Sequence, residues 1–309
     1  MPAMLAMLPP QMHVFVRDWL SANNVLLKSR DGHVLIDSGY IAHARLTLAL
    51  LASGRGLSGE PLAKLVNTHL HSDHIGGNAA VRRAYGCPIV FPATEAPFVE
   101  RWDTKALLLD YADQQAERFS IDEVLHAQTT QVWGDLEWQM LAAPGHDMGA
   151  LVFYNPEHRI LVSGDALWEN GYGFVMPASL DPDALPATRD TLDMIAGLDV
   201  RVVIPGHGEV FTEVGAALDR AYRRTAAFEA DETRVARHAL KALLTFTLLH
   251  RRRMAIADLP GYVDRIGIFR DFNAAVLRKT PVELAEMLVR ELVRAGALRI
   301  EGGWLVPAA

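Results

Sequence analysis

Short apolar runs alternate with amphipathic stretches over the first two thirds of the chain, up to about residue 225. Apolar runs bounded by turn residues predict β-strands, and apolar positions recurring at helical spacing predict α-helices. The predicted strands are His13–Val16, Val25–Lys28, His33–Ile36, Leu65–Thr68, Pro88–Phe91, Gln131–Trp133, Glu137–Leu141, Leu151–Tyr154, Ile160–Val162 and Val202–Ile204. The predicted helices are Ala42–Ala52, Gly77–Ala84, Pro97–Phe119, Ala184–Ala196 and Val214–Arg234. This alternation predicts layered sheets covered by helices rather than an all-α or all-β body.

The pattern changes after about residue 225. Three helical stretches are predicted at Val235–Arg252, at Ile256–Asp264 with a continuation towards Val276, and at Pro281–Ala295. A hairpin follows, with strands Leu298–Glu301 and Trp304–Val306 joined by Gly302-Gly303, because paired glycines accept the positive φ of a two-residue turn. Three helices followed by a hairpin predict a small domain like a winged helix-turn-helix.

The distribution of charge supports a division into two domains. Residues 1–222 hold 15 basic and 27 acidic side chains, whereas residues 223–309 hold 15 basic and 10 acidic ones. We therefore expect a catalytic domain over 1–222 and a winged-helix-like domain over 223–309. The formal net charge of −7 argues against a protein that binds nucleic acid or an anionic membrane over its whole surface.

The composition indicates the class of protein and the compartment in which it is expected. The 309 residues are half hydrophobic, which is too apolar for a disordered chain. Cys87 is the only cysteine, so the chain has no internal disulfide and no thiolate-rich metal cluster, as suits a reducing compartment. Met1–Met12 is apolar but carries no Lys or Arg, and no apolar run is long enough to cross a bilayer. A cytoplasmic protein without membrane contact is the expectation.

The segment Thr68-His69-Leu70-His71-Ser72-Asp73-His74 places four metal-binding side chains within six residues, after the apolar pair Leu65-Val66 and before a predicted helix. His69 and His71 are two residues apart, so at a strand end both point to the same side. Asp73 and His74 lie on the turn into the helix and reach the same space from another direction. A cluster of borderline ligands at such a corner predicts a metal site.

Three later turns have the same character. Each places a His or Asp next to small residues at the end of a predicted strand, as in Pro144-Gly145-His146-Asp147, Ser163-Gly164-Asp165 and Pro205-Gly206-His207-Gly208. The glycines allow sharp turns and leave space above the ligand. Each turn alone is a weak signal, but together with the histidine cluster the set predicts one composite metal centre.

From about His13 to Gly208 these motifs resemble the metallo-β-lactamase-fold hydrolases, in their binuclear, glyoxalase II-like branch. The strand-end Asp37 in Val34-Leu35-Ile36-Asp37-Ser38-Gly39 matches the first motif of the family. The resemblance implies an α+β fold, an αββα four-layer sandwich with its site at one edge of the sheets. It implies that His69, His71 and His146 hold one metal, that Asp73, His74 and His207 hold the other, that Asp165 bridges them, and that Asp37 supports them from behind.

Coordination chemistry gives the same picture. Imidazole and carboxylate ligands suit Zn²⁺, Fe²⁺ or Mn²⁺, and seven ligands are too many for one tetrahedral ion but fit two ions with a bridging carboxylate. The expected cofactor is two divalent ions, most simply zinc. Two such ions would share a hydroxide as the nucleophile, and Asp73 would orient it or take its proton. The predicted reaction is hydrolysis of a small-molecule ester, thioester or lactone.

Two segments near the site have open roles. Leu167–Gly173 resembles a stretch of glyoxalase II-like hydrolases, and its Trp168 and Tyr172 either line the substrate groove or pack beneath it as core. The insert Thr94–Gln128 is either a lid over the metals, a helix pair packed on the body, or a homodimer contact.

Two other functions compete with small-molecule hydrolysis. One is a metal-dependent endoribonuclease or phosphodiesterase that uses the winged helix and the basic residues Arg251–Arg253 and Arg278 on nucleic acid. The acidic side chains of Pro281–Ala295 make that helix a poor phosphate surface. The other is a non-catalytic nucleic-acid-binding regulator, which has no need of seven convergent ligands.

Overall fold

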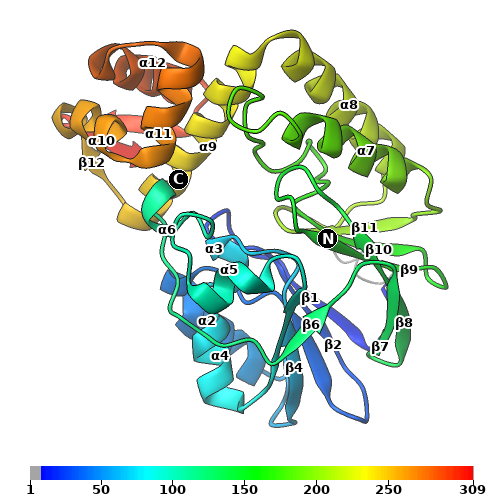
Figure 1. The fold of residues 1–309 in the computed structure, drawn as a ribbon. Helices are drawn as coiled ribbons and strands as arrows, with labels where there is room; N and C mark the ends of the chain where they lie inside the picture. Colours follow the sequence, from blue (N-terminus) through cyan, green and yellow to red (C-terminus); the bar gives the residue numbers. More distant parts are fainter. Residues whose placement is uncertain (1–7, 309) are drawn as a thin grey trace.

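The computed structural model describes residues 8–308, and its first sheet has six strands (Figure 1). Their order is β1-β2-β3-β4-β5-β6, antiparallel from β1 to β3 and parallel from β3 onwards. The strands are β1 Met12–Phe15, β2 Asn24–Leu27, β3 His33–Ile36, β4 Leu62–Val66, β5 Ile89–Pro92 and β6 Glu123–Leu125. All but β6 were predicted to within a few residues.

The second sheet has five strands in the order β11-β10-β9-β8-β7. They are β7 Thr129–Trp133, β8 Leu136–Ala142, β9 Leu151–Asn155, β10 Ile160–Gly164 and β11 Val202–Pro205. The pairing is antiparallel from β7 to β10, while β10 and β11 run parallel. Helix α7 (Ala184–Ala196) connects this last parallel pair, as a parallel crossover requires.

The two sheets face each other across one core and carry helices on their outer faces. Strand residues alternate between the layers: Val34 and Ile36 of β3 enter the core between the sheets, and Leu35 enters the core beneath the helices. Helices α2 (Ala44–Ala52), α4 (Asn78–Tyr85) and α5 (Ala96–Arg101) cover the first sheet. Helices α7 and α8 (Val214–Ala230) cover the second. The predicted αββα sandwich and α+β class are confirmed.

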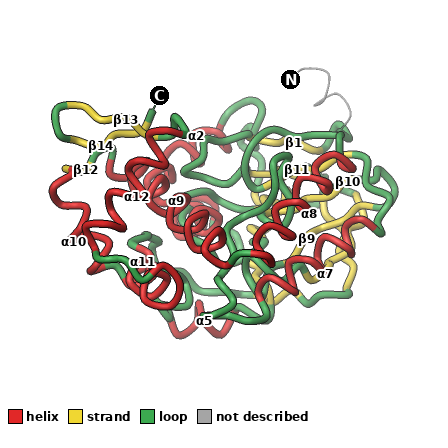
Figure 2. Tube along the Cα trace, turned by 90° about the horizontal axis from the view of Figure 1, so that it is seen from above, coloured by secondary structure: helices red, strands yellow, loops and turns green. Residues whose placement is uncertain are grey.

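The C-terminal region packs around a separate hydrophobic core (Figure 2). Its elements are α9 Glu232–Arg251, α10 Leu259–Arg265, α11 Gly267–Phe272 and α12 Pro281–Arg294, with the short strands β12 Met254–Ala255, β13 Leu298–Glu301 and β14 Trp304–Pro307. The strands form a sheet in the order β12-β14-β13. The winged-helix interpretation of this region stays a prediction.

The domain division at residues 222 and 223 also stays a prediction, and that point lies inside helix α8. The helices separate at Asp231, whose side chain accepts a hydrogen bond from the backbone N–H of Thr233 and caps α9. Val235 of α9 still packs with the core under α7 and α8, whereas Leu240, Leu244 and Leu248 lie in the C-terminal core. Helix α9 therefore links the two parts.

The helical stretch predicted over Pro97–Phe119 contains two short helices and is not helical between or after them. Helix α5 ends at Arg101 because Trp102 takes a left-handed conformation with φ 53°, and only the short helix α6 (Leu109–Ala112) follows. The apolar side chains serve two cores: Leu107 and Leu109 pack under the first sheet, while Ala112 joins the C-terminal core. No helix within residues 8–308 is long and apolar enough to cross a membrane.

Candidate metal centre

The loop after β4 is held in place by Asp37, the residue that follows β3. The Asp37 carboxylate accepts hydrogen bonds from the Thr68 backbone N–H (2.9 Å), the Thr68 hydroxyl (2.8 Å) and Nδ1 of His74 (2.7 Å). Asp37 has a positive φ of 56°, which Asp tolerates better than most residues. This buried carboxylate thus fixes the turn that carries the histidine cluster, and short helix α3 (Ser72–Ile75) begins directly after His71.

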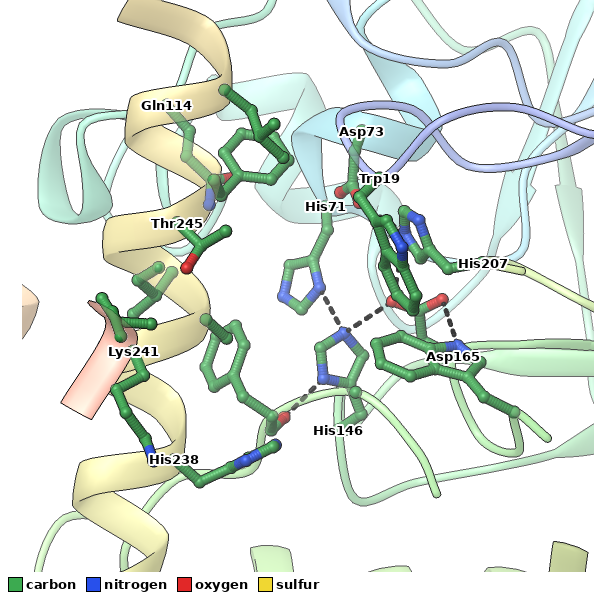
Figure 3. A pocket seen from close by; sticks show the side chains of 18 of the residues that line it. Trp19, His71, Asp73, Gln114, His146, Asp165, His207, His238, Lys241 and Thr245 are labelled. Carbon is green, nitrogen blue, oxygen red and sulfur yellow. Dashed lines mark hydrogen bonds and ion pairs between the residues drawn. The ribbon is translucent and has the colours of Figure 1, made fainter. Parts of the chain in front are cut away.

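Three of the predicted ligands form one group. His69 and His71 come from the loop after β4, and His146 comes from the loop after β8. Nε2 of His69 lies 3.1 Å from Nδ1 of His71. Nδ1 of His71 lies 2.8 Å from Nε2 of His146 (Figure 3). Nδ1 of His146 donates to the backbone carbonyl of Phe174, so its Nε2 presents a lone pair to the group when the ring is neutral.

The other four predicted ligands form a second group, Asp73, His74, Asp165 and His207. Asp73 and His74 lie on α3, Asp165 follows β10, and His207 follows β11. Nε2 of His207 lies 2.9 Å from Oδ2 of Asp73. Because His74 donates its Nδ1–H to Asp37, its Nε2 faces the group.

Asp165 lies between the two groups. Its Oδ1 is 3.4 Å from Nε2 of His74, and its Oδ2 is 3.4 Å from Nε2 of His146. A single carboxylate with one oxygen near each group is the arrangement expected of a bridging ligand. The structure therefore brings all seven predicted ligands together, in the two groups that the sequence suggested.

The electrostatics of the centre favour a bound cation. Burial, together with the neighbouring imidazoles of His74 and His71, holds the pKa of His69 well below its ordinary value. Burial and His146 lower the pKa of His71 to about 4. Both rings are therefore neutral ligands at pH 7.

The carboxylates draw positive charge towards them. Burial opposes ionisation of Asp165, but His74 and His207 hold its pKa well below the ordinary value. Burial likewise opposes protonation of His74, yet Asp37 and Asp165 hold its pKa well above the ordinary value. Asp37 and Asp165 therefore favour a positive charge beside them, which a bound divalent ion would supply.

The donor set fits divalent metals. Nε2 of His74 is buried and has no hydrogen-bond partner within the described chain, although it points at Asp165. Imidazole nitrogens packed 2.8 to 3.1 Å apart, next to ionised carboxylates, share one partner most readily when that partner is a cation. His69, His71 and His146 would hold one ion, and Asp73, His74 and His207 the other, with Asp165 between them.

Two glycines leave room for the ligands. A Cβ on Gly206 would overlap Oδ1 of Asp165, and a Cβ on Gly173 would overlap the ring of His146. These positions are glycine because ligand side chains occupy the space of a Cβ.

A cavity of about 320 Å³ opens from the ligand groups towards helix α9 (Figure 3). Trp168 lines it, and its Nε1–H donates to Oδ1 of Asp165 at 3.1 Å. Tyr172 does not line it: this ring is buried behind the site, with its hydroxyl 2.9 Å from the Thr225 hydroxyl. Of the two roles open for these aromatics, Trp168 has the groove position and Tyr172 has the core position.

Several cavity residues were not predicted from sequence. Trp19 stacks on His207 with ring centres 5.4 Å apart, and Phe174 packs against His71. Helix α9 supplies His238, Lys241 and further side chains. The spacing of these α9 residues places them on one face of the helix, and this could be predicted from the sequence. The sequence does not show that this face lines the cavity.

Known proteins that resemble this chain in sequence or fold include metal-binding proteins. The sequence profile described as "Metallo-beta-lactamase superfamily" matches residues 17–207. The chain is 29% identical over 199 residues to the probable metallo-hydrolase YflN of Bacillus subtilis (strain 168), a match that covers 57% of this chain and 75% of that protein. It is 25% identical over 221 residues to the acyl-coenzyme A thioesterase MBLAC2 of Gallus gallus, covering 65% and 76%.

A group of hydroxyacylglutathione hydrolases also matches. The enzyme of Nitrosococcus oceani is 30% identical over 165 residues, covering 53% of this chain and 55% of that protein. In six enzymes of this name, the match covers between 34% and 55% of the length of the enzyme.

Solved structures share the fold. TTHA1623 in a di-iron-bound form is 25% identical with a TM-score of 0.53, covering 68% of this chain and 98% of that one. The class B3 di-zinc metallo-beta-lactamase LRA-12 is 19% identical with a TM-score of 0.54, covering 70% and 90%. TTHA1429 from Thermus thermophilus is 19% identical with a TM-score of 0.55, covering 97% and 99%, so its fold extends over the C-terminal region as well.

The profile spans well over half of the chain, and the relatives include hydroxyacylglutathione hydrolases that match part of its length. The chain therefore belongs to the metallo-beta-lactamase superfamily of metal-dependent hydrolases, and its hydroxyacylglutathione hydrolase (glyoxalase II) relatives support a glyoxalase II-like branch.

Proposed function

We propose that this protein uses two metal ions to hydrolyse a small-molecule ester, thioester or lactone. The observation that carries the proposal is the convergence of two ligand groups on Asp165 at one end of a mostly apolar cavity. An apolar cavity with a few polar groups at one end suits a small organic substrate whose reactive bond lies at that end.

Two bound divalent ions would supply hydroxide at neutral pH and polarise the substrate carbonyl. The side chains of the protein then have distinct tasks. The Asp73 carboxylate, 2.9 Å from His207, is placed to orient the nucleophile or accept its proton. Asp37 fixes the ring of His74, and the Phe174 carbonyl fixes the ring of His146.

Aromatic side chains in the walls of the cavity would limit the access of water to the reacting bond. Trp19 and Trp168 flank His207, and Phe174 lies beside His71 and His146. Polarisation by charged groups is stronger in such a water-poor site than in bulk water. The similarity to a hydroxyacylglutathione hydrolase and to an acyl-coenzyme A thioesterase adds weight to a thioester among the three substrate classes.

The ribonuclease alternative is less well supported. Arg251 pairs with Asp113 at 2.7 Å, and the guanidinium of Arg253 lies 4.5 Å from the ring centre of Trp304. Neither arginine, nor Arg278, is among the residues that line the cavity. A ribonuclease needs cations along the path of the phosphates towards the reacting bond, and these residues are placed elsewhere.

We propose zinc as the metal because tetrahedral imidazole and carboxylate sites suit it, with iron or manganese as the other candidates. The di-iron and di-zinc forms of the structural neighbours make two ions the expected number. Metal analysis of the protein as purified identifies the element.

The test removes Asp165. The Asp165→Ala variant should lose at least one of two metal ions and lower thioester turnover more than about 100-fold, because even supporting residues of metal sites are worth 10- to 100-fold. The matched control is Glu169→Ala, which removes an exposed carboxylate four residues away. Metal content and hydrolysis of a panel of thioesters, lactones and single-stranded RNA are measured. Full activity of Asp165→Ala, or cleavage of RNA alone, contradicts the proposal.

A further inference from the structure

Helix α9 forms the wall of the cavity that faces the ligand groups, and it presents polar side chains there (Figure 3). His238, Lys241 and Thr245 recur at intervals of three and four residues, so they share one face of the helix. The other residues of this wall are apolar, among them Phe246 and Leu249. The cavity thus has a metal-binding end, an apolar middle and a polar stripe on α9.

The N-terminal half of this stripe carries excess positive charge. Glu291 of α12 pairs with both Arg237 (2.6 Å) and Lys241 (3.2 Å), so one carboxylate serves two cations. Arg224 of α8 donates to the backbone carbonyls of Tyr172 (3.2 Å) and Asn170 (2.7 Å) and has no carboxylate partner among the described residues. Within the described residues these three cations therefore have one carboxylate partner, Glu291, and of the three only Lys241 lines the cavity.

Two neutral polar side chains of the stripe, His238 and Thr245, can also form hydrogen bonds with a molecule in the cavity. The ring of His238 and the hydroxyl of Thr245 line the cavity, and within residues 8–308 neither group makes a hydrogen bond with another residue. Burial and the neighbouring cations Arg224 and Lys241 lower the pKa of His238 to about 4, so this ring is neutral at pH 7 and acts as donor or acceptor. Both side chains are partly exposed, so they are free to exchange solvent for a polar group of a bound molecule.

We infer that α9 recognises a carboxylate on the substrate, with Lys241 as the cation that binds it and with His238 and Thr245 as hydrogen-bonding neighbours. The inference rests on the proposed function, since it places the ester or thioester bond at the metals. The substrate is then an apolar ester with a carboxylate at the end away from the reacting bond. A single cavity-lining lysine suits a monoanion, whereas phosphate sites more often use arginine forks or backbone N–H groups.

The chain offers a matched pair for the test. Lys241 and Arg237 both pair with Glu291, but only Lys241 lines the cavity, whereas Arg237 lines a separate surface groove. Lys241→Met and Arg237→Met each remove one cation from the same carboxylate. An effect of the lost ion pair on folding would appear in both variants, and an effect on substrate recognition only in Lys241→Met.

The substrates are two esters of equal chain length, p-nitrophenyl octanoate and mono-p-nitrophenyl suberate, which differ by the terminal carboxylate. The wild type and Arg237→Met should prefer the suberate ester by about 10- to 100-fold in kcat/KM, the range of a charge-assisted hydrogen bond. Lys241→Met should lose this preference through a higher KM for the suberate ester alone, and Lys241→Arg should restore part of it. Calorimetry should show free suberate binding more tightly than octanoate to the wild type and not to Lys241→Met.

Equal turnover of both esters by the wild type, or equal losses in Lys241→Met and Arg237→Met, overturns the inference and leaves the proposed hydrolase function standing. If neither ester is hydrolysed, ester hydrolysis is contradicted, and calorimetry alone decides the inference. Equal binding of suberate and octanoate then overturns it, and tighter binding of suberate that depends on Lys241 supports it.

Discussion

At the scale of single residues, the space around Asp165 is as important as its charge. Asp165 reaches both ligand groups because Gly206, on the neighbouring strand end, has no side chain to fill that space. The absence of a Cβ at position 206 thus leaves the space in which the Asp165 carboxylate lies between the two ligand groups. Gly206 is consequently under a steric constraint that its backbone conformation alone does not impose.

We predict that Gly206→Ala reduces metal content and turnover while leaving the fold intact, because the new Cβ overlaps Oδ1 of Asp165 and must displace it. Gly215→Ala is the control. Gly215 lies in α8 with open space at its Cβ position, so alanine should stabilise the helix by up to about 1 kcal/mol. Metal analysis and circular dichroism measure both effects. Two tightly bound ions in Gly206→Ala would show that Asp165 can move without cost.

The ligands could be predicted because each belongs to a short motif at a strand end, where the local sequence decides the position. His69 to His74 stand in one segment, and His146, Asp165 and His207 each stand beside glycine. Trp19, His238 and Lys241 could not be predicted in this way. These residues line the cavity because a loop and a helix that are distant in sequence pack against it. That packing cannot be derived from a single sequence.

At the scale of elements, too, features set by the local sequence could be predicted, and features set by the packing of distant segments could not. Strands buried on both faces were readable as apolar runs, and β3 and α7 have the predicted bounds. The apolar positions after Pro97 predicted more helix than forms, because they pack into two different cores and the chain turns between them. Strand β6 was missed because Glu123 and Val124 are exposed, and only Leu125 of its three residues is buried.

One face of helix α9 packs in the C-terminal core, and another face lines the cavity. Substitution of one leucine on each face should distinguish their contributions to stability and to substrate binding. Leu244 is buried in the C-terminal core, and Leu249 lines the cavity. Leu244→Ala should lower the free energy of unfolding by about 2 to 5 kcal/mol, the usual cost of a buried Leu to Ala change. Leu249→Ala should lower it by less than half as much and should raise KM. Urea denaturation and steady-state kinetics compare the two. A larger loss of stability in Leu249→Ala would contradict this division.

At the scale of the whole molecule, the candidate metal centre collects side chains from parts of the fold that packing and a few hydrogen bonds, such as that from the Leu151 backbone N–H to the Thr68 carbonyl, already hold together. The loop after β4 extends from the first sheet, and Asp165 and His207 extend from the second. Lys241 and its neighbours on α9 complete the cavity from the C-terminal region. Metal ions bound between the sheets would therefore stabilise the arrangement of the entire catalytic sandwich.

We predict that metal binding raises the thermal unfolding temperature in a concentration-dependent way. Ligand that binds only the folded state contributes about 2.7 kcal/mol at 100 times its dissociation constant. Chelator-treated protein is titrated with zinc, manganese or iron while unfolding is followed by calorimetry, with Asp165→Ala as the control that should respond less. An unfolding temperature that none of these metals changes would argue against ions between the sheets.

The position of the ligands along the chain also orders events during biosynthesis. The ribosome releases His69 to His74 early, in one segment, but His207 emerges only after the strands from β5 to β11 have been made. A nascent chain that ends before β11 lacks part of the second metal group, and one that ends before α9 lacks the wall of the cavity. The complete set of seven candidate ligands thus exists only late in synthesis, and a chain that ends before His207 would lack a finished second group.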